Sequence, residues 1–216
     1  MNYFDIAYTA IGGLGVFFLG LKFLSEGLQS GSTDAIQRIL ATFTKNRVLA
    51  VLAGVGITVV VQSSSISTVM TVSLVNAGLM ELKQAIGVIL GANIGTTVTG
   101  WILSIKVGKY GLLLIGLGIY PMMAGKSARA SAIGKTLVAL GLIFTGLEFM
   151  SGAFAPLRSD QNFISYLHLF DAQTLGSLMA CVAIGCLLTV IIQSSSAMLG
   201  ITITLASTGV IDFNTA

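Results

Sequence analysis

The stretch VVVQSSSISTV (Val59–Val69) places Gln62–Ser65 in the middle of a segment without charged residues. The stretch TVIIQSSSAML (Thr189–Leu199) places a second QSSS, Gln193–Ser196, in the same kind of surroundings. Polar side chains are costly in an apolar segment unless hydrogen bonds or a ligand satisfy them. Four in a row, twice in one chain, therefore indicate a specific polar role for these two tetrapeptides.

Composition sets the class of protein. Of the 216 residues, 55% are hydrophobic and 9% are charged, whereas a soluble domain carries about 25% charged residues. The chain is therefore expected to be an all-α, polytopic integral membrane protein. Its formal net charge of +3 is small and spread over several connectors, so nucleic acid is not an expected partner.

Segment length predicts how the first QSSS lies in the membrane. The uncharged run Val48–Met80 gives QSSS two flanks, each about 20 Å long as a helix against a hydrocarbon core of about 30 Å. We therefore expect a re-entrant helical hairpin that turns at QSSS and returns to its starting side. The second run, Ala172–Ile211, has longer flanks, so either a re-entrant or a full helical hairpin is open there.

Further apolar runs predict helices at Ile6–Leu28, Gln84–Ile105, Tyr110–Ala124 and Ile133–Phe154. The second of these contains GANIGTT (Gly91–Thr97), for which two readings stay open. Gly87, Gly91 and Gly95 form a small-xxx-small stripe that suits a packing face. The polar residues beside the stripe, Asn93, Thr96 and Thr97, indicate instead a second polar break in an interrupted transmembrane helix.

An internal repeat relates the two halves of the chain. FFLGLKFLS (Phe17–Ser25) matches IFTGLEFMS (Ile143–Ser151), and TVVVQSSS matches TVIIQSSS further on. We therefore expect two repeats, residues 1–125 and 126–216. An odd number of crossings, three, separates the start of one repeat from the start of the next, so the repeats should be inverted relative to each other.

The positive-inside rule supports this inversion. With the connector after the first helix placed in the cytoplasm, the inner side holds Lys22, Arg38, Lys45, Arg47, Lys83, Lys126, Arg129 and Lys135, and the outer side holds Lys106, Lys109 and Arg158. This excess predicts an N-terminus outside the cell.

Inverted repeats with interrupted apolar segments are typical of secondary transporters. The N–H groups that begin a half-helix can hold an anion without a basic side chain. The carbonyls that end a half-helix, together with Ser and Gln oxygens, suit a hard cation such as Na⁺. The runs Val48–Met80, Gln84–Ile105 and Ala172–Ile211 contain no ionisable Asp, Glu, Lys, Arg or His. This favours coupling to a metal cation over coupling to protons.

The paired QSSS motifs, with GANIGTTVT (Gly91–Thr99) after the first, resemble the type II sodium-dependent phosphate cotransporter family. The resemblance implies Na⁺-driven phosphate symport in a bacterial inner membrane, with the two hairpins meeting near the membrane centre. It points to the residues of both QSSS motifs and to Asn93, Thr96 and Thr97. Among the polar residues we expect phosphate at Ser63, Ser64, Ser194 and Ser195, and Na⁺ at Gln62, Ser65, Thr68, Asn93, Thr96, Thr97, Gln193 and Ser196. Phosphate, sodium ions and the lipid bilayer are then the expected partners, no organic cofactor is expected, and a homodimer is left open.

Two alternatives to transport remain open from the sequence. The family has a second NIGTT-like segment after the second QSSS, but Ala216 aligns with Ala85. We therefore expect a truncated chain or a half-site supplied by another chain, which makes a non-transporting subunit the first alternative. An intramembrane serine hydrolase is the second, but its nucleophile needs a positioned base. The chain has one histidine, His168, in a connector, and no G-x-S-x-G elbow. No enzyme is expected.

Overall fold

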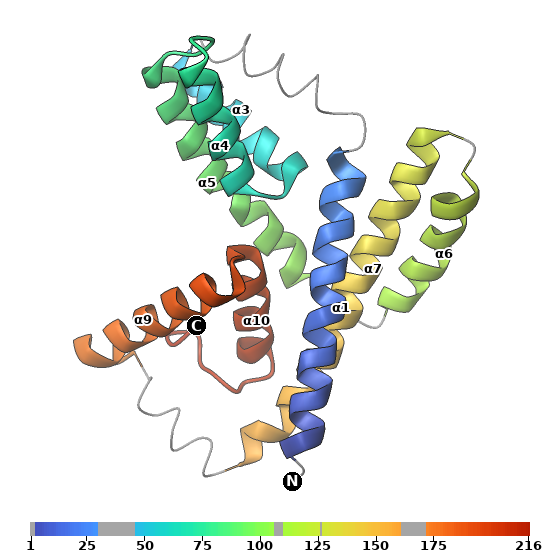
Figure 1. Cartoon of the computed structure of the whole chain (residues 1–216). Coiled ribbons are helices and arrows are strands. Elements are labelled where there is room, and N and C mark those ends of the chain that lie inside the picture. The colour runs from blue at the N-terminus through green and yellow to red at the C-terminus, as the bar shows by residue number, and fades with distance from the viewer. Residues whose placement is uncertain (1–2, 30–45, 106–109, 126, 161–171) are drawn as a thin grey trace. The chain divides into compact units, whose positions relative to one another are not determined.

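The computed structural model describes residues 3–29, 46–105, 110–125, 127–160 and 172–216. Within these ranges every regular element is a helix and there is no strand, so the all-α prediction is confirmed (Figure 1). The elements are α1 (Tyr3–Gln29), α3 (Arg47–Val61), α4 (Ser64–Asn76), α5 (Leu82–Ser104), α6 (Gly111–Ala124), α7 (Ala128–Phe154), the 3₁₀ helix η2 (Ala155–Ser159), α9 (Leu175–Ile192) and α10 (Ser195–Ser207).

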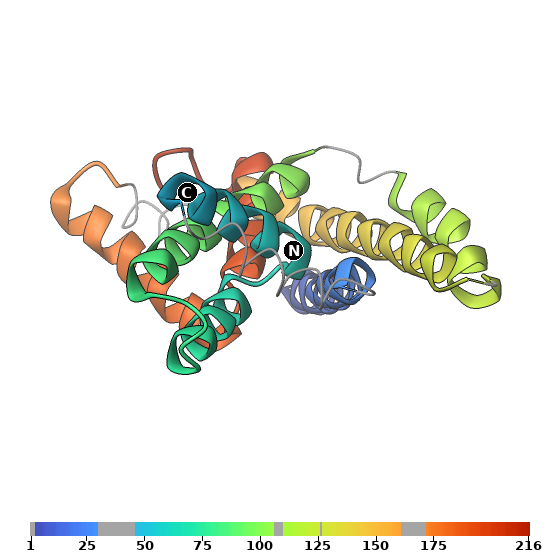
Figure 2. The same cartoon turned by 90° about the horizontal axis from the view of Figure 1, so that it is seen from above.

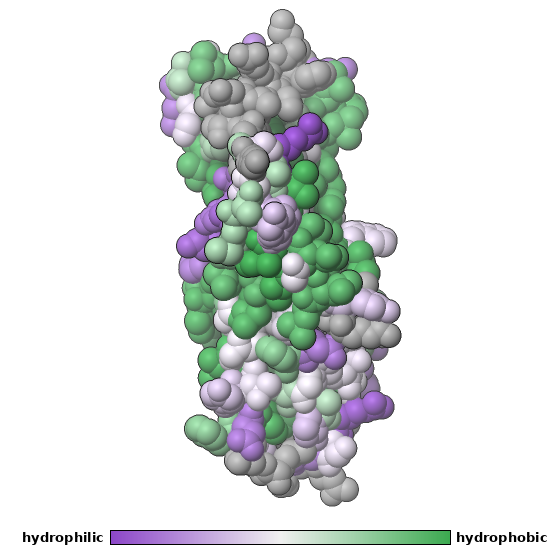
Figure 3. All heavy atoms as spheres, turned by 90° about the vertical axis from the view of Figure 1, so that its right-hand side faces the viewer, coloured by the Kyte–Doolittle hydropathy of each residue, from purple (hydrophilic) through white to green (hydrophobic). Residues whose placement is uncertain are grey.

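Four helical segments in the described part of the chain are long and apolar enough to cross a membrane: Tyr3–Gln29, Leu82–Ser104, Ala128–Ser159 and Leu175–Ile192. Much of the face drawn in Figure 3 is hydrophobic, which suits a surface covered by lipid. The chain is therefore an integral membrane protein. Helix α6 has 14 residues, about 21 Å, so its expected crossing stays a prediction.

Contacts divide the chain into two compact units. Unit 1 comprises Met1–Gly20, Lys106–Leu112 and Gly141–Ala216, and unit 2 comprises Leu21–Ile105 and Leu113–Leu140. Helices α1 and α7 contribute one part to each unit. Unit 2 contains the first QSSS and unit 1 contains the second.

The core of unit 2 is the contact between α3 and α5, which Figure 1 shows side by side. Gly54 of α3 lies against Val88 so closely that a methyl group would overlap the Val88 carbonyl oxygen. Gly91 of α5 lies in the same way against the carbonyl of Val51. Glycine is required at both positions because the two backbones touch. The small-xxx-small stripe is therefore a packing face, as one of the two readings predicted.

The other reading, a second polar break at GANIGTT, is wrong. Helix α5 runs without interruption from Leu82 to Ser104. The hydroxyl of Thr96 donates to the Ala92 carbonyl at 3.2 Å, and that of Thr97 donates to the Ile94 carbonyl at 2.7 Å. Because these side chains find acceptors in their own helix, the polar residues need no break in the backbone.

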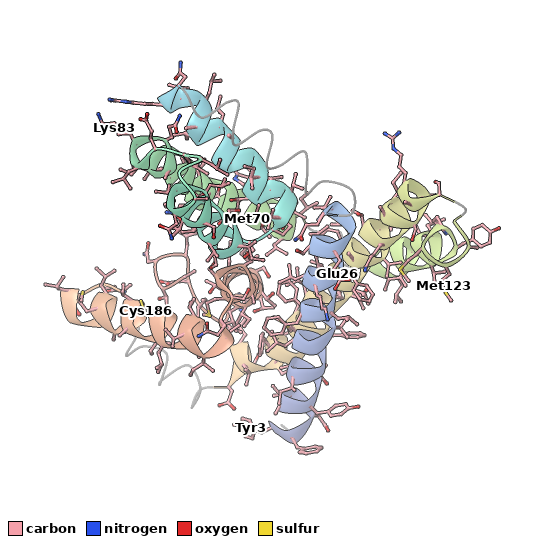
Figure 4. The ribbon with its side chains drawn as sticks, turned by 45° about the horizontal axis from the view of Figure 1, so that its top comes forward. Tyr3, Glu26, Met70, Lys83, Met123 and Cys186 are labelled. Carbon is pink, nitrogen blue, oxygen red and sulfur yellow. The ribbon has the colours of Figure 1, made fainter. Side chains whose placement is uncertain are left out.

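Helices α1 and α7, whose sequences match in the repeat, lie side by side and antiparallel (Figures 1 and 2). In unit 1, Gly13 packs against Gly146; in unit 2, Gly27 packs against Thr136. In unit 2, Lys135 of α7 also forms an ion pair with Glu26 of α1. Figure 4 labels Glu26. Within unit 1, Gly200 of α10 packs on the ring of the fully buried Phe17.

Helix α9 contrasts with α3, its counterpart in the repeat. No residue of α9 is buried, and Val190 and Ile191 expose 65% and 67% of their surface. Figure 4 labels another exposed residue of this helix, Cys186. An apolar helix with this exposure requires lipid or protein around it.

Several residues on which the predicted orientation depends lie outside the described part of the chain. This applies to Arg38, Lys45, Lys106, Lys109 and Lys126, and also to His168. The location of the N-terminus outside the cell stays a prediction.

The glycine contact of α3 gives the first testable prediction. Gly54→Ala should lower the free energy of unfolding by about 1–3 kcal/mol, because the added methyl meets a backbone oxygen that cannot move aside. Gly56→Ala is the matched control, since no atom lies within 4 Å of a methyl at that exposed position of the same helix. It should stabilise the protein by up to about 1 kcal/mol. Unfolding in mixed micelles measures both; equal effects would contradict the close contact.

Candidate functional site

The first QSSS interrupts the helical chain at one residue with a left-handed backbone. Helix α3 ends at Val61, and Gln62 follows with φ 58° and ψ 22°. The backbone N–H of Gln62 donates to the Thr58 carbonyl at 2.7 Å. Its side-chain Nε2 donates to the Val59 carbonyl at 2.6 Å. Gln62 thus satisfies two of the last carbonyls of α3, which have no partner within the helix.

The serines begin the next helix. Ser63 is extended, with φ −151°, and caps α4: its Oγ accepts the Ile66 N–H at 3.3 Å. Ser64 and Ser65 follow as the first two helical residues, and the first N–H groups of a helix have no intrahelical acceptor. Their amides therefore present partial positive charge at the break, a suitable place for an anion.

The second QSSS has the same local structure. Gln193 ends α9 with φ 58° and ψ 22°, and its Nε2 donates to the Val190 carbonyl at 2.5 Å. Ser194, with φ −147°, caps α10 by accepting the Ala197 N–H at 3.2 Å. Helices α4 and α10 have 13 residues each. The two breaks predicted from the sequence are both present, with matching caps.

The surroundings of the two breaks differ. In unit 2, Thr58 Oγ1 donates to Ser67 Oγ at 3.0 Å, joining α3 to α4, and both side chains are buried. At the corresponding positions of unit 1, Thr189 donates instead to the Gly185 carbonyl of its own helix, and Met198 replaces the serine. A hydrogen bond between two hydroxyl groups therefore joins the two helices of the first hairpin, and the second hairpin lacks this bond.

Other helices also reach the first break. Thr99 of α5 donates to Gln62 Oε1 at 3.0 Å. From α1, Ser25 Oγ donates to the Val61 carbonyl at 2.9 Å, and Gln29 Nε2 donates to the same oxygen at 3.1 Å. These three residues were not among the predicted site residues. Thr99 carried a usable signal, since it lies four residues after Gly95 and so shares the face of α5 that packs on α3.

The predicted site residues are exposed to different degrees. Gln62, Ser63, Ser64, Thr68, Thr96, Ser194 and Ser196 are half-buried, whereas Ser65, Asn93, Thr97, Gln193 and Ser195 are exposed. Each QSSS brings its own glutamine and serines together at one break. In the described ranges, no hydrogen bond joins Asn93, Thr96 or Thr97 to QSSS; Thr99 makes that contact instead. The two hairpins belong to different units, so their meeting stays a prediction.

The chemistry available at the breaks is that of neutral oxygen atoms and peptide groups. Among the residues that the structure describes, no three His, Cys, Asp or Glu side chains are grouped to hold a metal ion. Hydroxyl, amide and carbonyl oxygens suit a hard monovalent cation, and helix-initiating N–H groups suit an oxyanion. Each break can thus offer both kinds of site within a few residues.

Comparisons with known proteins agree with this chemistry. A family model described as Na+/Pi-cotransporter matches residues 16–152. The Salmonella typhimurium protein YjbB, named for inorganic phosphate export, is 31% identical over 197 residues, 91% of this chain and 36% of that protein. The Bacillus subtilis protein YqeW is 31% identical over 222 residues, 98% of this chain and 66% of that protein.

A mammalian relative matches a shorter stretch. The sodium-dependent phosphate transport protein 2A of Rattus norvegicus is 38% identical over 97 residues, 44% of this chain and 15% of that protein. The chain thus spans only part of the length of each of these relatives. No solved structure gives a significant match to it.

The hydrogen bond between Thr58 and Ser67 in the first hairpin can be tested by paired substitutions. Thr58→Val removes a buried hydroxyl that joins two helices and should lower the free energy of unfolding by about 1 kcal/mol. Thr189→Val, at the corresponding position of the second hairpin, removes a hydroxyl bonded only within its own helix. It should change the stability by less than about 0.5 kcal/mol. Thermal unfolding of both variants in detergent checks the difference, and a larger loss in Thr189→Val would refute it.

Proposed function

Because this chain belongs to the Na+/Pi-cotransporter family, we propose that it carries inorganic phosphate across the membrane in symport with Na⁺. The family is one of transporters and not of enzymes, which removes the serine hydrolase alternative. The observation that carries the proposal is the pair of matching helix breaks at Gln62–Ser65 and Gln193–Ser196.

Phosphate is held, in this proposal, at the beginnings of α4 and α10. Its oxygens accept hydrogen bonds from the hydroxyls of Ser63, Ser64, Ser194 and Ser195 and from the free amides of the first helical turns. Charge-assisted hydrogen bonds of this kind are about twice as strong as neutral ones. No basic side chain is needed, which agrees with the uncharged sequence around both motifs.

Na⁺ is held by neutral oxygens beside the phosphate. The candidates are Gln62, Ser65, Thr68, Asn93, Thr96, Thr97, Gln193 and Ser196. The side-chain amide of Gln62 is the best supported of them, because its oxygen lies at the break and already accepts a hydrogen bond from Thr99. Binding of the cation next to the anion would lower the electrostatic cost of placing either in a poorly hydrated region.

For the whole assembly we propose two inverted repeats, residues 1–125 and 126–216, with re-entrant hairpins that meet near the membrane midplane. The antiparallel contact of α1 with α7 supports the inversion. We place the protein in a bacterial inner membrane with its N-terminus outside. The chain spans 36% of the length of the Salmonella relative, so the activity of that whole protein comes to this chain only as a proposal.

Phosphate export without sodium is the second candidate, because the Salmonella relative is named for phosphate export. The two candidates share the phosphate site and differ in the driving ion and the direction. Transport measured with and without a Na⁺ gradient separates them.

The symport proposal predicts Na⁺-dependent uptake of radiolabelled phosphate into proteoliposomes. Ser64→Ala and Ser195→Ala should each reduce phosphate affinity about tenfold or more, since each removes a donor to a charged ligand. Ser73→Ala is the control, because that exposed hydroxyl of α4 bonds to the Val69 carbonyl of its own helix. Uptake that continues when choline replaces Na⁺ would rule out sodium coupling. Full phosphate affinity in both serine variants would rule out this phosphate site.

A further inference from the structure

The end of α3 is contacted by a polar pair on α1. The Val61 carbonyl oxygen accepts hydrogen bonds from Ser25 Oγ at 2.9 Å and from Gln29 Nε2 at 3.1 Å. Gln29 Nε2 also lies 2.6 Å from Ser25 Oγ. The amide nitrogen therefore lies between two oxygen atoms, and all three groups are partly buried inside unit 2.

This arrangement has the features of a cation site filled by a hydrogen-bond donor. The Val61 carbonyl belongs to the last turn of α3, where carbonyls lack helical partners and carry partial negative charge. A half-turn of the Gln29 amide would exchange its nitrogen for its oxygen. Val61 O, Ser25 Oγ and Gln29 Oε1 would then converge.

We propose that Ser25, Gln29 and the Val61 carbonyl form a Na⁺ site at the C-terminal end of α3, with the Gln29 amide group in the place of the ion when none is bound. The inference rests on the proposed function for the identity of the ion. Neutral oxygens at a helix C-terminus are the donors that Na⁺ takes in broken transmembrane helices. The neighbouring carboxylate, Glu26, is paired with Lys135 and is not needed as a ligand.

The site is specific to the first half of the chain. In the repeat, Ser151 aligns with Ser25, and Ala155 takes the place of Gln29. In the second half, where both residues are described, no hydrogen bond links Ser151 to the Ile192 carbonyl, the counterpart of Val61. The repeat therefore supplies a matched control: a serine at the same position without the amide or the contact.

Equilibrium binding of radioactive sodium to the purified chain in lipid nanodiscs tests the site. Ser25→Ala should weaken Na⁺ binding on the order of tenfold, because it removes one of few ligands. Gln29→Glu should tighten Na⁺ binding severalfold or more, because a carboxylate oxygen replaces the amide oxygen. Ser151→Ala should leave the affinity unchanged.

The Gln29→Glu variant separates a cation site from a bond that only stabilises the fold. A carboxylate cannot donate to the Val61 carbonyl, so a purely structural contact would be weakened with no gain in Na⁺ affinity. Unchanged affinity in both Ser25→Ala and Gln29→Glu, with monodisperse elution showing that they fold, would overturn this site and leave sodium coupling intact. If Ser25→Ala does not fold, the affinity of Gln29→Glu decides alone. Absence of Na⁺ binding by the unaltered chain would overturn both the site and the coupling.

Discussion

The structure depends on how backbone groups are satisfied where a helix stops inside an apolar segment. An interrupted helix leaves carbonyls on one side of the break and N–H groups on the other, and a membrane interior offers little water to either. In QSSS, one residue satisfies a carbonyl before the break and another satisfies an N–H group after it. The glutamine returns its side chain to a carbonyl of the preceding turn, and the first serine caps the following helix. The groups left over are then available to ligands.

This division of tasks explains why the same four residues occur twice. The left-handed conformation of Gln62 and Gln193 turns the chain sharply enough for a new helix to begin two residues later. In both copies the cap distances and dihedral angles agree closely. What differs is the support around them: α1 and α5 make hydrogen bonds to the first break. The local structure is thus set by the tetrapeptide, and its chemical environment is set by tertiary contacts.

The sequence allowed the helices and both breaks to be predicted because these features depend on local properties. Charge-free runs, segment length and the polar tetrapeptides lie within a few turns of the positions that they control. Of the two readings of GANIGTT, the break was wrong, and the sequence could not decide between them because a threonine that bonds back to its own helix looks the same in sequence as one that binds a ligand. The contribution of Ser25 and Gln29 was missed for another reason. Each lies more than 30 residues before Val61, and only the packing of α1 reveals the contact.

The glycine contacts between α3 and α5 have a mechanical consequence. Backbone atoms meet at Gly54 and Gly91 without intervening side chains, and such an interface has no flexible groups that could absorb sliding or tilting. Helix α5 and the helix that leads into the first QSSS must therefore shift as one rigid body. Any rearrangement that alters access to this motif therefore has its hinges outside this pair of helices. Gly78, with a positive φ of 70°, lies in the turn between α4 and α5.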